Sequence, residues 1–124
     1  MPGERRERER TRKPFERLYD DKNPFLGGVL GKTVTDSITA GTTQTQAGAT
    51  ALTTEINRVT VSAVNGDGVK LPSAEAGYEV LVINDDSAQT IQIWPNTGDK
   101  IDSGAANAAD TNSLAAGASR RYIA

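Results

Sequence analysis

Short stretches in which apolar and polar residues alternate run through the chain from residue 33 onward. In the first of them, Val34 and Ile38 fall on one face, which is the period-two pattern of a half-buried strand. The stretches predicted as strands are 33–39, 56–64, 69–71, 78–84, 90–94 and 119–123. Short strands at near-regular spacing are typical of a β-sandwich or a small barrel.

Two stretches carry further information about pairing and burial. Gly66, Asp67 and Gly68 stand between two of the strands and predict a hairpin turn. The run at 78–84 is apolar at most positions, which predicts a strand buried on both faces. Helical periodicity is absent after residue 32. We therefore predict an all-β fold, a small β-sandwich or barrel-like, jelly-roll-like domain, over residues 55–124.

The chain before residue 55 divides into two segments of different composition. Residues 33–54 contain nine threonines and very few charges, which predicts an extended connector with one strand. Residues 1–32 form an extended, charged N-terminal arm with at most a short helix. Within the arm, Phe15, Leu18 and Tyr19 are spaced to share one helical face. These apolar side chains either dock on a partner or fold back onto the core.

Charge is distributed unevenly between the arm and the rest of the chain. Residues 1–32 contain nine Lys or Arg and six Asp or Glu, a net charge of +3. The remaining residues contain five and ten, a net charge of -5, and the two parts sum to -2. Such asymmetry indicates an interaction segment. Because Leu, Ile, Val and Phe together number only 24 of 124 residues, we also expect the chain to complete its core in an oligomer.

Candidate chemistry is sparse in this sequence. Histidine and cysteine are both absent, which removes the commonest general base and the commonest metal ligands. The run Gly27 to Thr33 resembles a phosphate-binding loop but has one residue too few between its glycines. The adjacent Asp85 and Asp86 make a poor acid–base pair, and Asn96, Asp99 and Asp102 match no calcium loop. We expect no enzyme activity, no cofactor and no metal.

The basic residues of the arm raise nucleic acid as a possible partner. Glutamates are interleaved with them, and a mixed pattern suits a patchy protein surface better than a uniform polyanion. Without an apolar run of about 20 residues, no membrane span is expected either. We therefore expect a protein partner.

The last two-thirds of the chain resemble a β module of tailed-bacteriophage structural proteins, namely capsid decoration (cement) proteins and head-fibre or tail-fibre domains. The residues that carry the resemblance are 45–50, 56–60, 66–72, 82–84, 94–101 and 114–119. The resemblance implies a virion protein that is made in the host cytoplasm, binds the outer surface of the phage head and bridges major capsid protein subunits. It also implies a homo-oligomer, preferably a trimer.

On this interpretation the arm anchors the protein to the capsid. The apolar anchors are Phe15, Leu18, Tyr19, Phe25 and Leu26, and the rim contacts are Arg5, Arg6, Arg8, Arg10 and Arg12. The alternative function is a head-fibre or tail-associated adhesion module. In that case the loops at 84–89 and 95–112 would bind a host-surface glycan, with Trp94 stacking on a sugar.

Overall fold

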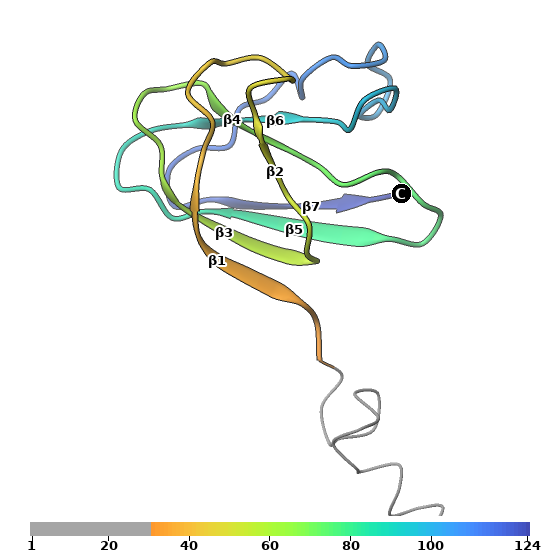
Figure 1. Cartoon of the computed structure of the whole chain (residues 1–124), viewed down its shortest axis with the longest axis horizontal. Coiled ribbons are helices and arrows are strands. Elements are labelled where there is room, and N and C mark those ends of the chain that lie inside the picture. The colour runs from red at the N-terminus through yellow and green to blue at the C-terminus, as the bar shows by residue number, and fades with distance from the viewer. Residues whose placement is uncertain (1–30) are drawn as a thin grey trace, which may run out of the picture. The chain divides into compact units, whose positions relative to one another are not determined.

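The computed structural model describes residues 31–124, and this part of the chain forms two β-sheets and no helix (Figure 1). Its strands are β1 (Val34–Thr39), β2 (Thr50–Ala51), β3 (Ile56–Val61), β4 (Asp67–Lys70), β5 (Glu79–Asn84), β6 (Ile91–Trp94) and β7 (Ser119–Ile123). The all-β prediction is confirmed for these residues. Each of the six predicted stretches overlaps a strand, although β4 begins two residues before the predicted 69–71, and only the two-residue β2 has no counterpart among them.

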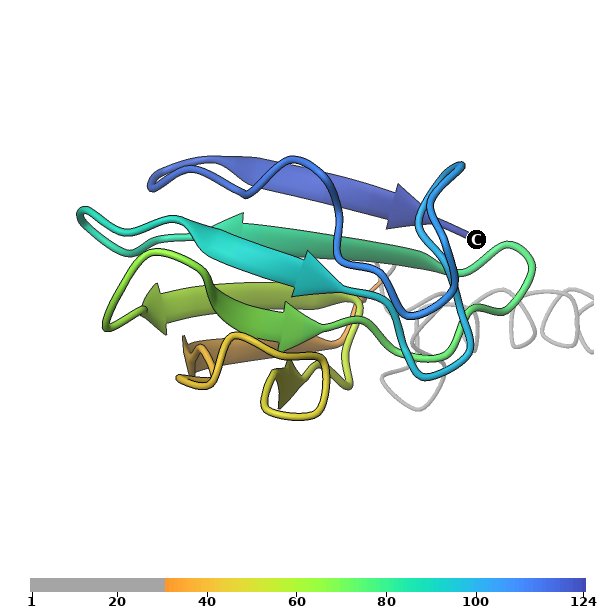
Figure 2. The ribbon, with the colours of Figure 1, turned by 90° about the horizontal axis from the view of Figure 1, so that it is seen from above.

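Successive strands alternate between the two sheets. The four-stranded sheet has the order β1-β3-β5-β7, and the three-stranded sheet has the order β2-β4-β6. Neighbouring strands are parallel, except that β7 pairs antiparallel with β5. Figure 2 shows the successive strand pairs lying side by side. The chain therefore winds as three stacked coils, each with one strand in each sheet, and β7 covers the last coil.

The register gives the length of each coil. Val34 is opposite Ile56, and Ile56 is opposite Leu81, so the chain returns to the same row after 22 and then 25 residues. In the other sheet, Thr50, Val69 and Ile93 are aligned, with steps of 19 and 24 residues. Parallel strands need a crossover of about a dozen residues or more. A strand of the opposite sheet is part of each crossover here.

The barrel-like and jelly-roll-like alternatives are wrong. The sheets do not close into a barrel, because β1 and β7 are the edges of one sheet and β2 and β6 are the edges of the other. A jelly roll is built from antiparallel strands, whereas four of the five pairings here are parallel. Alternation of apolar and polar residues is compatible with either direction of pairing, which is why the sequence pattern did not separate them.

The predicted hairpin at Gly66, Asp67 and Gly68 is also wrong, because β3 and β4 belong to different sheets. The buried Asp67 carboxylate accepts hydrogen bonds from the N–H groups of Ala63 and Val64 at 3.0 and 3.2 Å. These bonds fold the turn back onto β4. Residues 33–54, expected as a connector, supply β1 and β2, and both strands pair with strands of the later coils.

An apolar core fills the space between the two sheets. Its buried side chains are Ile38, Ala40, Leu52, Val59, Val69, Val80, Val82, Ile91, Ile93 and Leu114. Burying a side chain of this kind contributes roughly 1.5–3 kcal/mol. Strand β5 is fully buried only on its inner face, because Leu81 and Ile83 on its outer face are half-buried. The prediction of a strand buried on both faces is therefore met on one face.

Candidate functional site

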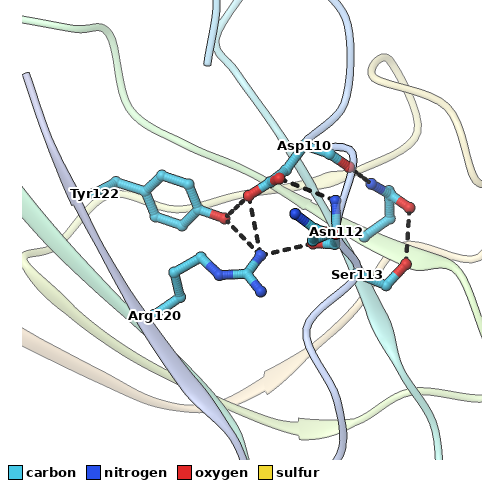
Figure 3. A network of polar contacts seen from close by, with 6 residues as sticks. Asp110, Asn112, Ser113, Arg120 and Tyr122 are labelled. Atoms are coloured by element: carbon cyan, nitrogen blue, oxygen red, sulfur yellow. Dashed lines mark hydrogen bonds and ion pairs between the residues drawn. The ribbon is translucent and has the colours of Figure 1, made fainter. Parts of the chain in front are cut away.

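A network of polar side chains joins β7 to the long loop that precedes it (Figure 3). The Asp110 carboxylate accepts a hydrogen bond from the Tyr122 hydroxyl at 2.7 Å and one from Nη1 of Arg120 at 3.0 Å. The same Arg120 nitrogen donates to the backbone oxygen of Asn112 at 2.6 Å. Arg120 and Tyr122 are two residues apart in a strand, so their side chains lie on the same face of the sheet.

Asp110 is held in place by β6. Its N–H donates to the backbone oxygen of Ile93 at 2.8 Å, and its own backbone oxygen accepts from the Gln92 amide at 2.5 Å. A few residues later, Leu114 and Ile91 exchange two backbone hydrogen bonds, at 2.8 and 3.0 Å. The loop is thus fixed to the neighbouring strand, and it presents the Asp110 carboxylate to β7 in a defined position.

The electrostatics of this network keep Asp110 charged and Tyr122 neutral. Burial acts to raise the pKa of the Asp110 carboxyl. The hydrogen bonds from Tyr122 and from the Asn112 N–H, with the positive charge of Arg120, outweigh burial and lower that pKa. Burial, and then the hydrogen bond to Asp110, raise the pKa of the Tyr122 hydroxyl well above its usual value. At neutral pH the hydroxyl is therefore a donor and the carboxylate an acceptor.

Replacing Tyr122 with phenylalanine is expected to remove the hydrogen bond from its hydroxyl to Asp110 and to lower the free energy of unfolding by about 1–2 kcal/mol at pH 7. Since the folded pKa of Tyr122 is raised, its contribution is complete below the unfolded pKa of about 10 and is lost as the pH rises through the folded value. The wild type should therefore lose stability above about pH 10 more steeply than Tyr122→Phe. Urea unfolding at several alkaline pH values measures both slopes, and equal slopes would contradict the assignment.

A cavity of about 210 Å³ lies beside the polar network, and Arg120 and Tyr122 contribute to its lining. The other lining residues come from the segment after β4, the start of β5, the loop after β6 and the end of β7. The hydrogen-bonding and cationic members of this lining include Ser73, Tyr78 and Lys100. This cavity has the polar groups and aromatic rings of a small-molecule site.

The outer face of the four-stranded sheet is apolar at its centre. Val34, Ile56 and Leu81 form one row across β1, β3 and β5, and Ile83 and Ile123 lie on the same face. Two of these side chains are largely exposed, Val34 at 60% and Ile123 at 69%. Contiguous exposed apolar residues mark surfaces that contact other macromolecules. We call this set the apolar sheet face.

Charged residues border the apolar sheet face. Arg58 forms ion pairs with Asp36, at 2.7 Å, and with Asp85. The hydrogen bonds to Asp36 and then to Asp85 raise the pKa of Arg58, and the bond from Arg58 lowers the pKa of Asp36. These exposed pairs contribute little to stability but fix the orientation of the guanidinium beside Ile83, its neighbour in register.

Every anchor residue predicted from the sequence lies outside the described residues, because all ten positions fall between residues 5 and 26. The rejected carboxylate pair is separated: Asp85 binds Arg58, while Asp86 accepts from backbone N–H groups, including that of Gln89 at 2.8 Å. Asp99 accepts from the Ala74 N–H at 2.8 Å. Within residues 31–124, no group of three or more Asp, Glu, His or Cys is placed to hold a metal ion.

The sequence pattern did not mark the cavity residues Tyr78, Lys100, Arg120, Arg121 and Tyr122 as members of a site. One signal for them was present: three of the five Lys or Arg after residue 32 belong to this set. The predicted strand at 119–123 also implied that Arg120 and Tyr122 share a face. Asp110, 10 residues earlier in a loop, could be assigned to them only from the structure.

The described residues include no helix long and apolar enough to cross a membrane. Comparison with protein-family models, with curated proteins and with solved structures found no match to this chain.

Proposed function

We propose that this chain is a virion structural protein, a capsid decoration (cement) protein that binds the outer surface of a phage head and bridges major capsid protein subunits. We further propose that its two sheets form a β-sandwich and that the protein is a homo-oligomer, preferably a trimer. The resemblance of its β module to phage structural proteins motivates this proposal. It assigns the protein no catalytic role.

The observation that carries the proposal is the apolar sheet face. Exposed side chains such as Val34 and Ile123 bury apolar area only when another molecule covers them, and each square ångström buried contributes roughly 25 cal/mol. The rim around them is charged and includes Arg58 and Asp36. An apolar centre inside a polar rim is the usual anatomy of a protein–protein interface.

In the proposed mechanism, each copy contacts two coat subunits and holds them together. The arm supplies one set of contacts through Phe15, Leu18, Tyr19, Phe25 and Leu26, and its arginines set the register at the rim. The sheet face supplies a second set. Two linked contacts give an effective concentration that raises the apparent affinity by a large factor, and repetition over a symmetric shell stabilises the particle.

The test is co-sedimentation with empty capsids assembled from the coat protein encoded in the same genome. We expect the full chain to bind, and we expect the double variant Val34→Glu, Ile123→Glu to bind at least about tenfold more weakly, because it places charge on both edges of the apolar sheet face. Val64→Glu is the matched control, since Val64 is an exposed valine at 49% that lies in the turn after β3. The variant Phe15→Ser, Phe25→Ser tests the arm in the same way.

Equal binding by all of these variants would contradict the assigned contacts. The role itself is tested by mass spectrometry of purified particles. A copy number comparable to that of the coat protein supports decoration, and absence of the chain from the particles overturns it.

A further inference from the structure

The cavity beside the polar network is lined by inward-facing side chains of β5 and β7 and by the loop after β6. The register places Tyr122 opposite Val80, and Val80 is buried in the core, so the Tyr122 side chain faces inward with it. Arg121 is opposite Leu81, and its side chain lies on the outer face of the sheet. A ligand in the cavity therefore meets the side chains of the inner face and of the loop, without the charge of Arg121.

The charged groups of the cavity balance one another. Lys100 and Arg120 in the lining carry two positive charges. Asp102, also in the lining, and Asp110, which is bound to Arg120, carry two negative charges. Without net charge, the cavity favours neither an anion nor a cation over a neutral molecule. It still offers hydrogen-bond donors and an acceptor, so the matching ligand is uncharged and carries groups of both kinds.

One donor of the cavity is held in place before any ligand arrives. Arg120 uses Nη1 alone for its contacts with Asp110, Asn112 and Tyr122, so Nε and Nη2 remain for another acceptor. The network of Figure 3 fixes the position of this guanidinium. Such preorganisation reduces the cost of binding.

Two tyrosines give the cavity a wall that suits a sugar ring. Tyr78 and Tyr122 both line it, and both pack against the apolar core. An aromatic ring offers a flat apolar surface, against which the C–H face of a sugar can pack. The volume of about 210 Å³ lies below the range of roughly 300–1,000 Å³ for drug-sized ligands, which limits the occupant to one ring. Trp94, the stacking residue suggested by the sequence, is not part of the lining.

We propose that this cavity binds a single neutral monosaccharide unit, an uncharged hexose or N-acetylhexosamine, with its C–H face against the tyrosines. A hydroxyl both donates and accepts hydrogen bonds, so the sugar can accept from Arg120 and Lys100 and donate to the Asp102 carboxylate. Hydrogen bonds with one charged partner are about twice as strong as those between neutral groups. The inference goes beyond the proposed capsid role and does not depend on it.

The experiment is a titration of the full ¹⁵N-labelled chain, followed by its amide ¹H–¹⁵N spectrum. The probes are the methyl glycosides of glucose, galactose, mannose and N-acetylglucosamine at millimolar concentrations. Glycerol serves as the polyol without a ring, and methyl glucuronide serves as the charged counterpart of the glucoside. We expect saturable shifts at Ser73, Lys100 and Asp102 with at least one of the four glycosides. We expect none with glycerol, and no tighter binding of the glucuronide than of the glucoside.

Variants at exposed positions separate the cavity from the rest of the surface. Lys100→Met and Asp102→Gly each remove one hydrogen-bonding side chain from the lining, and glycine readily adopts the positive φ of 51° at residue 102. Each variant should weaken binding of the glycoside about tenfold. Lys70→Met is the matched control, because Lys70 is not part of the lining, and it should leave binding unchanged.

Four results would overturn the proposal. They are the absence of saturable shifts with all four glycosides, equal shifts with glycerol, tighter binding of the glucuronide than of the glucoside, and unchanged binding by both cavity variants. None of them would alter the outcome of the capsid assay, so the two proposals fail separately.

Discussion

Replacing Gly41 with alanine is expected to destabilise the domain by about 3 kcal/mol or more. A Cβ atom at this position would stand 1.9 Å from the backbone oxygen of Gly48 and 2.9 Å from its carbonyl carbon. Both distances lie inside van der Waals contact. Because the neighbour is backbone, it cannot rotate away as the end of a flexible side chain would.

Neither side of this contact is free to move. The Gly41 N–H donates to the backbone oxygen of Gly68 at 2.8 Å, and the Gly68 N–H donates back to the Gly41 oxygen at 2.9 Å. Gly48, for its part, donates its N–H to the Thr45 hydroxyl at 3.1 Å. The alanine methyl group would therefore break the bridge between the segment after β1 and β4, and with it the alignment of the first two coils.

Urea unfolding followed by circular dichroism measures this effect. The matched control is Gly31→Ala, because an added Cβ at Gly31 meets no atom within 4 Å. We expect the control to change the free energy of unfolding by no more than about 0.5 kcal/mol. If the two variants unfold at the same urea concentration, the close approach of Gly41 to Gly48 is wrong.

The positions of the strands followed from the sequence with useful accuracy. β7 has the predicted bounds, and β1, β5 and β6 begin one residue later than predicted. Strand position depends on local alternation, because an inward side chain must be apolar wherever it faces the core. The inward series Val80, Val82 in β5 and Ile91, Ile93 in β6 satisfies this condition.

The way the strands pair did not follow from the sequence. Parallel and antiparallel partners require the same alternation along one strand, and the direction depends on where the chain goes after each turn. At Asp67 a buried carboxylate directs the chain into the second sheet, and a Gly-Asp-Gly turn alone does not reveal this. The aligned positions are also unevenly spaced, by 22 and then 25 residues, so the repeating coils leave no fixed period in the sequence.

The cavity beside Arg120 and Tyr122 could not be predicted from the sequence either. Its residues come from four segments between Leu71 and Ala124, and only the stacking of the last coil brings them together. Composition indicated an acidic body, but the approach of Lys100 to the cavity lined by Arg120 and Tyr122 depends on the long loop after β6. The anchors predicted in the arm rest on the sequence alone.

Replacing Asn84 with aspartate is expected to destabilise the domain by about 3–5 kcal/mol at pH 7, although it exchanges a single NH₂ group for oxygen. Asn84 is fully buried at the end of β5. Its amide nitrogen donates to the backbone oxygens of Gln89 and Leu114, both at 2.9 Å, and its side-chain oxygen accepts from the Asp86 N–H at 3.1 Å. A carboxylate would place a negative charge against two carbonyl oxygens that have lost their donors.

The size of this effect follows from what Asn84 connects. Gln89 lies in the turn between the two strands of the last coil, and Leu114 lies in the segment that leads to β7. The backbone of Asn84 adds a second tie to that segment, since its N–H donates to Ala118 and its oxygen accepts from Gly117. The amide side chain of Asn84 thus holds the last of the three coils to the segment that leads to β7, the strand that covers it.

The pH dependence distinguishes buried charge from a simple loss of packing. The pKa of the introduced carboxyl should lie above its unfolded value of about 3.9, because burial and the facing carbonyl oxygens disfavour the charged form. The penalty is therefore smallest below about pH 4 and grows as the pH rises through the folded pKa. Asn65→Asp is the matched control. The side-chain oxygen of Asn65 accepts hydrogen bonds from the N–H and the hydroxyl of Thr90, and an aspartate keeps both of these bonds. Only a charged group can make the difference in stability between the variant and the wild type depend on pH in this range. If urea unfolding gave Asn84→Asp the same loss of stability at pH 4 and pH 7, the cause would be steric and not electrostatic.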